Sequence, residues 1–199
     1  AAPILVVALS WFTPAGDVWR HLVQTVLGGL LLNTVVLMLG VGGGVFLLGA
    51  GLAWLTTMYD FPGRRLFDWA LMLPLAIPAY VLAFVAVALL DFSGPVQGAL
   101  RALFGGAWFP PIRSAGGVVA VMVLAFYPYV YMLARAAFLA QGRRMLETGR
   151  VLGLSPRAAF LRVALPMARP ALAAGVALAL MEALADFGAV AIFNYDTFT

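Results

Sequence analysis

Four long apolar segments constrain this chain more than any other feature. They cover roughly residues 30–56, 69–90, 116–139 and 171–193, and each can cross ~30 Å of hydrocarbon, which takes about 20 apolar residues in helical form. Hydrophobic residues make up 64% of the 199 positions and charged residues only 10%, too few for the polar surface of a soluble domain. We therefore predict an all-α fold, a polytopic transmembrane helical bundle forming a single domain over residues 1–199.

The two ends of the sequence look incomplete. The chain opens with AAPILVVALSWF, which is too short to span a membrane and has no basic stretch before it, as a signal peptide would. We interpret this segment as the outer part of a first helix. Because the chain stops just after DTFT, we expect a fragment that is incomplete at both ends.

The arginines indicate the orientation in the membrane. Arg64 and Arg65 lie between the first two spans, and six more arginines occupy the loop 141–170 between the last two. The remaining connections hold only Arg20, Arg101 and Arg113. The positive-inside rule therefore places the two basic loops in the cytoplasm of a multi-pass protein of the bacterial plasma (inner) membrane. We therefore interpret the net charge of +4 as setting orientation in the membrane, and we expect lipid, and not nucleic acid, as a partner.

The loop 141–170 contains a helical pattern with marked boundaries. Residues 147–154 have helical spacing, and Gly153 suits the left-handed turn that ends a helix. Ser155 and Pro156 predict a new helix start, since a serine caps free N–H groups and proline fits the first turn. Phe160, Val163 and Ala164 then share one face, with Arg157 and Arg162 off it. We expect a compact helix-turn-helix that Pro166 and Pro170 end before the next span.

The same loop resembles the cytoplasmic signature of binding-protein-dependent ABC importer permeases. That signature reads E-A-A, three residues, G, nine residues, I, any residue, L-P, and Glu147, Gly153, Val163, Leu165 and Pro166 stand at its positions. Two departures are Thr148 and Gly149 in place of the alanines. The stretches YDFPGRR, PLAIPAYVLAF, YPYVYMLARAAF and MEALADFGAVAIFNYDTFT further resemble the N-terminal half of ferric iron ABC transporter permeases.

The resemblance implies a fold, partners and a role. The fold is that of a type I permease, and the loop is the coupling region that inserts into a groove of an ABC ATPase subunit dimer. The residues assigned to this contact are Glu147, Gly153, Leu154, Ser155, Pro156, Arg157, Phe160, Val163, Leu165 and Pro166. Further implied partners are a periplasmic or extracellular solute-binding protein and a second permease half. ATP belongs to the partner subunit, and this chain binds no cofactor.

Other functions remain as alternatives to ferric iron import. Permeases for sulfate, thiamine or polyamine share the signature, and a non-transporting membrane scaffold could derive from a permease half. The loop itself could be a solvated connector, although the glycine, cap and proline spacing favours coupling. No enzymatic activity is expected, since the sequence lacks both the phosphate-binding motif G-x-x-x-x-G-K-[ST] and the metalloprotease motif H-E-x-x-H.

Two acidic residues lie inside the last span. Glu182 and Asp186 are four positions apart and so share a helix face, at a depth where charges are expensive. On a cavity wall they would favour a hard cation such as iron(III), which prefers oxygen ligands. Alternatively, they are structural, protonated or hydrogen-bonded to another helix. Arg135 is expected too near the cytoplasmic end to pair with them.

Several smaller features predict local structure. Gly40 and Gly44 form a small-xxx-small pair that indicates either dimerisation or, as we favour, packing within the chain. Pro74 and Pro78 predict a kink in the second span and Pro128 one in the third. Asp60 and Asp68 are interpreted as surface ion-pair partners of Arg64 and Arg65. The tryptophans, including Trp54, lie near span ends and are interpreted as headgroup anchors.

Overall fold

The computed structural model describes residues 16–105, 110–151 and 153–198. Helices and short connections make up these ranges, which contain no strand. In chain order the elements are α2 (Gly16–Thr25), α3 (Leu27–Met58), α4 (Arg64–Ala70), the 3-10 turn η1 (Leu73–Ala76), α5 (Ala79–Leu90), α6 (Pro95–Phe104), α7 (Ala115–Val151), α8 (Pro156–Ala159), the π-helical η2 (Phe160–Ala164), α9 (Leu165–Met167), α10 (Arg169–Ala185) and α11 (Phe187–Ile192). The all-α prediction is confirmed.

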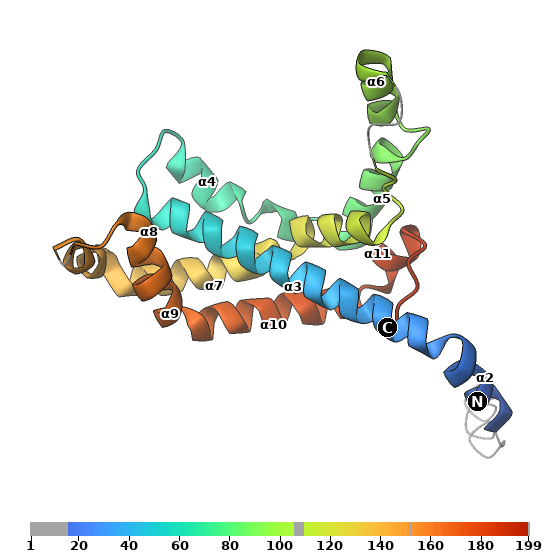
Figure 1. The fold of residues 1–199 in the computed structure, drawn as a ribbon. Coiled ribbons are helices and arrows are strands. Elements are labelled where there is room, and N and C mark those ends of the chain that lie inside the picture. Colours follow the sequence, from blue (N-terminus) through green and yellow to red (C-terminus); the bar gives the residue numbers. More distant parts are fainter. Residues whose placement is uncertain (1–15, 106–109, 152, 199) are drawn as a thin grey trace, which may run out of the picture.

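Three long helices form the core of the molecule. Figure 1 shows α3, α7 and α10 side by side, with α7 packed against both of the others. By length and composition, Leu27–Met58, Ala79–Phe104 and Ala115–Gln141 can each cross a membrane, and the bent pair Arg157–Met167 with Arg169–Ala185 adds a fourth crossing if it counts as one span. The chain is a multi-pass membrane protein.

The glycines of α3 serve packing within the chain. A Cβ atom added at Gly44 would lie 2.3 Å from Val123 of α7, and one added at Gly40 would lie 2.9 Å from Val119. Both distances are below van der Waals contact, so the two helices approach each other through these glycines. The favoured interpretation of the small-xxx-small pair is confirmed.

The expected second span, 69–90, is not one helix. The chain forms α4 and η1, passes through Ile77 and Pro78 in extended conformation, and only then begins α5. Pro74 sits at the start of η1 and Pro78 directly before α5. Because each proline lacks an N–H group and disfavours helix in the residue before it, two of them four residues apart break the helix where we expected a kink.

The third and fourth spans also differ from expectation. Helix α7 runs without interruption from Ala115 through Pro128 to Val151, so the first limb of the loop 141–170 is a continuation of this span and not a separate short helix. The last span was expected to reach residue 193, yet α10 ends at Ala185, and Asp186 leaves the helical conformation before α11. The span is therefore divided at Asp186.

The arginine-rich connections gather at one end of the bundle. Figure 1 shows α8 and α9 and the connection that leads into α4 at the same end. Arg64 forms an ion pair with Asp60 as expected. Asp68 does not pair with these arginines: its Oδ1 lies 3.2 Å from Arg135 Nη2 of α7. The surface interpretation of Asp68 is wrong, because the carboxylate faces α7 and only about a quarter of it is exposed.

Polar contacts hold α11 at the opposite end. Arg113, just before α7, lies 3.3 Å from Asp91 at the end of α5. It also donates from Nη1 to the backbone oxygen of Ile192, the last residue of α11, at 3.0 Å. One guanidinium thus joins α5, α7 and α11, the elements that surround the cavity described next.

Candidate functional site

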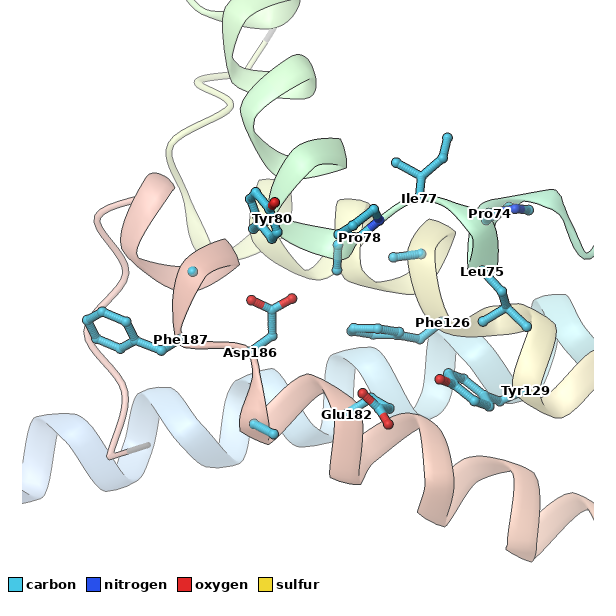
Figure 2. A pocket seen from close by; sticks show the side chains of 14 residues that line it. Pro74, Leu75, Ile77, Pro78, Tyr80, Phe126, Tyr129, Glu182, Asp186 and Phe187 are labelled. Carbon is cyan, nitrogen blue, oxygen red and sulfur yellow. The ribbon is translucent and has the colours of Figure 1, made fainter.

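A cavity of about 500 Å³ lies where the two broken spans face each other. One wall is the break between η1 and α5, and the opposite wall is the break between α10 and α11, with α7 between them (Figure 2). The lining residues are Pro74, Leu75, Ile77, Pro78, Ala79, Tyr80, Ala125, Phe126, Tyr129, Glu182, Ala185, Asp186, Phe187 and Gly188. Irregular backbone at membrane depth is tolerated where it lines such a cavity.

Glu182 and Asp186 both line this cavity, as one of the two interpretations of these acids required. Figure 2 shows their carboxylates on the same side of the space, Asp186 at the break and Glu182 one turn earlier on α10. Glu182 is exposed, and among the described residues it has no hydrogen-bond or ion-pair partner. The structure thus places the carboxylate of Glu182 at the cavity, where no other described residue bonds to its oxygens.

Asp186 has a structural contact as well. Its Oδ1 accepts a hydrogen bond from the backbone N–H of Ala189 at 2.8 Å, so it caps the first turn of α11. A capping aspartate offers one oxygen to the helix and keeps a second for other partners. The two alternatives for this residue are therefore compatible, since the same carboxylate ends one helix segment, starts the next and faces the cavity.

Aromatic residues that the sequence analysis did not single out complete the cavity. Tyr80 comes from the first turn of α5, and Phe126 and Tyr129 come from α7 (Figure 2). A Cβ atom added at Gly188 would meet Tyr80 Cβ at 3.1 Å, so the glycine lets α11 pack closely on α5. Two features of the sequence could have predicted the breaks that form this cavity. One is the pair Pro74 and Pro78 in the second span, and the other is Asp186 as the possible start of a helix within the last span.

The chemistry of the cavity is that of oxygen donors. Two carboxylates and two phenols line it, and none of the described lining residues is basic. Among the described residues there is no group of three or more His, Cys, Asp or Glu that could hold a resident metal ion. Through its described residues the cavity thus offers oxygen atoms, the ligand type that hard cations prefer.

The second candidate site is the element at the arginine-rich end, residues 154–167, which we call the end element. Before it, Gly153 has φ of +81° and ends the preceding helix, as predicted. Ser155 Oγ accepts from the backbone N–H of Ala158 at 3.2 Å, so the predicted N-cap is confirmed. The side chains of Glu147 and Pro156 and all of Leu152 lie outside what the structure describes.

The end element has an outward face and an inward face. Ser155, Arg157, Leu161 and Arg162 are exposed, whereas Leu154, Phe160, Val163, Leu165 and Pro166 are partly buried and Ala164 is buried. The predicted apolar face of Phe160, Val163 and Ala164 is confirmed. Pro166 does not end the element, because a proline at the start of α9 needs no N–H donor there; the axis turns by 73° one step later, around Ala168.

Trp54 of α3 has a different role from the one expected. It is only 8% exposed, and its ring contacts Phe160 of the end element and Phe138 of α7. The prediction of a headgroup anchor is wrong for this residue. A tryptophan near a span end is an anchor only if nothing covers it, and here the returning chain packs over it.

The sequence matches one family of known proteins over most of its length. Residues 45–196 match the family described as binding-protein-dependent transport system inner membrane component. The chain belongs to this family. The match includes the loop 141–170 and both breaks that form the cavity, so the resemblance drawn from the signature positions is confirmed.

Individual relatives of this family agree. The chain is 34% identical over 170 residues to the Fe(3+)-transport system permease protein FbpB 2 of Haemophilus influenzae, covering 85% of this chain. It is 33% identical to the probable sulfate transport system permease protein cysT of Nephroselmis olivacea and 32% identical to the sulfate transport system permease protein CysT of Escherichia coli, covering 76% and 74% of the chain. It spans 30% of the first relative's length and 51% of the length of the other two.

Proposed function

We propose that the chain is the membrane-spanning permease part of an ATP-driven importer. It lines the solute path and changes access when a separate ATPase dimer closes on residues 146–166. The observation that supports this most is the end element: a capped, partly exposed turn of helices at the arginine-rich end of the bundle, in a chain of this permease family. The chain itself performs no covalent chemistry and binds no cofactor, and ATP stays on the partner.

The other partners follow from the two ends of the bundle. The arginine-rich end faces the cytoplasm by the positive-inside rule and meets the ATPase. A solute-binding protein delivers cargo at the opposite end, where Arg113 joins α5, α7 and α11. A second permease half completes the path on the side of the cavity that this chain leaves open.

The proposed cargo is ferric iron. Glu182 and Asp186 give the cavity a negative character, and no basic residue lines it among those described. Iron(III) is a hard cation that prefers oxygen ligands. A transport path must bind its cargo weakly enough to release it, and two carboxylates without a third ligand meet that need. The ferric relative from Haemophilus influenzae supports the same cargo.

The second candidate cargo is an oxyanion such as sulfate. It is favoured by the two sulfate permeases among the relatives. An oxyanion would have to pass two carboxylates in this cavity, so its transport requires that one or both be protonated or engaged elsewhere, as Asp186 partly is through the N–H of Ala189.

A charge reversal tests the coupling role. Glu147→Lys should abolish co-purification of the ATPase subunit with the transporter and, with it, ATP-dependent solute uptake. Asp60→Lys is the matched control, because it makes the same charge change on an exposed residue at the same end of the bundle. If Glu147→Lys leaves the ATPase bound and the wild type transports nothing, the chain is a non-transporting scaffold.

Uptake measurements test the cargo. Membrane vesicles that contain the native transporter are incubated in parallel with external radiolabelled iron(III) and external radiolabelled sulfate. Iron uptake should exceed background, and Glu182→Gln should lower it about tenfold, the effect of losing roughly 1.4 kcal/mol of interaction. Uptake of sulfate in place of iron, unchanged by Glu182→Gln, would assign the path to an oxyanion.

A further inference from the structure

Three aromatic rings join the end element to the bundle. Phe160 of η2 lies 4.7 Å from Trp54 of α3 and 6.3 Å from Phe138 of α7, between ring centroids, and Trp54 and Phe138 lie 5.6 Å apart. Each ring comes from a different element. We call these three residues the aromatic joint.

The joint is firmly seated in the bundle. Phe138 is fully buried and Trp54 nearly so. Aromatic side chains have few rotatable bonds and bury large areas, so rings in edge and tilted contact hold their positions closely. A second contact reinforces the joint, because Gln141 Nε2 of α7 donates to the backbone oxygen of Ala164 at 3.4 Å. The end element is thus attached sideways to α3 and α7.

The end element is also joined to α10 directly along the chain, and this connection is bent. Between the end element and α10 the axis bends by 73°, with Pro166 on one side and Pro170 on the other. The preceding turn, Phe160–Ala164, is π-helical, a wider form that often marks functional positions. Pro166 and Pro170 cannot donate backbone hydrogen bonds, so fewer such bonds link the end element to α10 across the bend, whereas the packed rings of the joint hold their positions closely.

We propose that Phe160 is the positioning residue that ties the end element to α3 and α7. When the end element moves, the ring contacts of the aromatic joint transmit the displacement to α3 and α7. The chain connection transmits a smaller part of it to α10. This inference rests on the proposed coupling function and adds the residue and the route by which the motion reaches the membrane helices. The exposed side chains Arg157, Leu161 and Arg162 remain available for the ATPase on the opposite face.

The first test truncates the ring. Phe160→Ala is compared with Phe84→Ala, the same substitution at a ring of α5 that is 64% exposed, in the native transporter reconstituted with its ATPase and loaded binding protein. The resemblance assigned Phe160 to the ATPase contact, but its ring packs on Trp54 and Phe138 of the bundle. We therefore expect Phe160→Ala to keep the ATPase in the complex and to lose the coupling between solute and hydrolysis. Solute-stimulated hydrolysis and uptake should fall tenfold or more together, and Phe160→Trp should restore part of both. Phe84→Ala should change neither by more than twofold.

The second test restores the joint by chemistry. The chain contains no cysteine, so the pair Trp54→Cys with Phe160→Cys gives two unique thiols. Without a cross-linker this double variant should be uncoupled like Phe160→Ala. A short bifunctional thiol reagent should recover solute-stimulated hydrolysis, since the route needs only a firm link at this place. Recovery also shows that the double variant is folded.

The outcomes separate this inference from the function on which it rests. If wild-type transporter neither retains an ATPase nor moves solute, the proposed function fails whatever Phe160 does. If wild type is active and Phe160→Ala keeps its solute stimulation, or loses the ATPase from the complex, the positioning role is overturned. A cross-linked pair that stays uncoupled overturns it as well.

Discussion

Arg135 of α7 donates to Asp68 of α4 across 67 positions of sequence, with Nη2 at 3.2 Å and Nε at 3.4 Å from Oδ1. The same aspartate accepts at its backbone oxygen from Tyr131 OH at 3.2 Å. No residue of α4 is buried, so these polar contacts, more than apolar packing, hold the first half of the broken span against the bundle.

Loss of this ion pair should destabilise the protein measurably. Asp68→Ala leaves the half-buried guanidinium of Arg135 without its partner, and we expect the free energy of unfolding to fall by about 1–3 kcal/mol. The measurement is the midpoint of thermal unfolding in detergent, followed by tryptophan fluorescence. Asp60→Ala is the control, because its carboxylate is 71% exposed and such pairs contribute about 1 kcal/mol at most. Equal shifts for the two variants would contradict the role given to Asp68.

Two glycines of α3 should respond in opposite directions to the same substitution. A Cβ added at Gly49 would lie 2.7 Å from Val130 Cβ and 2.9 Å from the backbone oxygen of Tyr127, whereas nothing lies within 4 Å of one added at Gly51. Gly49→Ala should therefore separate α3 from α7 and destabilise the bundle by about 1–3 kcal/mol. Gly51→Ala should be neutral or stabilising by up to about 1 kcal/mol, because alanine favours helix. Thermal unfolding of both variants checks this; a loss of stability in Gly51→Ala alone would refute the packing assignment.

The charge and the cap of Asp186 can be separated. Asparagine keeps an oxygen for the N–H of Ala189 but removes the negative charge, and alanine removes both. Asp186→Asn should therefore preserve thermal stability, while Asp186→Ala should lower the free energy of unfolding by about 1 kcal/mol. Iron uptake should fall in both variants if the carboxylate acts on the cargo. Full uptake in Asp186→Asn would limit this residue to its capping role.

The sequence was sufficient to predict the parts that depend on local rules. Apolar length predicts membrane helices, and the turn at Gly153 and the cap at Ser155 follow from the conformations these residues favour. Both were found where expected. The proline pair also predicted a disturbance of the helix before α5, although a kink was expected and the helix is fully broken there.

The remaining features depend on which segments meet in space. The return of the chain over the end of α3 covers Trp54 with Phe160, and the fold of α4 against α7 brings Asp68 to Arg135. A single sequence contains no pattern that predicts such pairs. The cavity is of the same kind, since it needs two breaks in separate spans to lie opposite each other. Helix length was misjudged for a related reason: apolar periodicity does not reveal that α7 continues into the polar loop.

The conformation of Gly153 yields a last prediction that isolates backbone strain from steric clash. Its φ is +81° and nothing lies within 4 Å of an added Cβ, so a substitution there acts only through the backbone. Gly153→Val should displace the start of the end element and sharply reduce both ATPase co-purification and uptake, because a β-branched residue in this region is strained by about 1–2 kcal/mol or more. Gly153→Asn should retain most activity, since asparagine tolerates the left-handed conformation. Gly98→Val is the control: its added Cβ also meets nothing within 4 Å, but its φ is not positive, so it should leave co-purification and uptake unchanged. If Gly153→Val behaves like Gly98→Val, the left-handed turn is not what positions the end element for its partner.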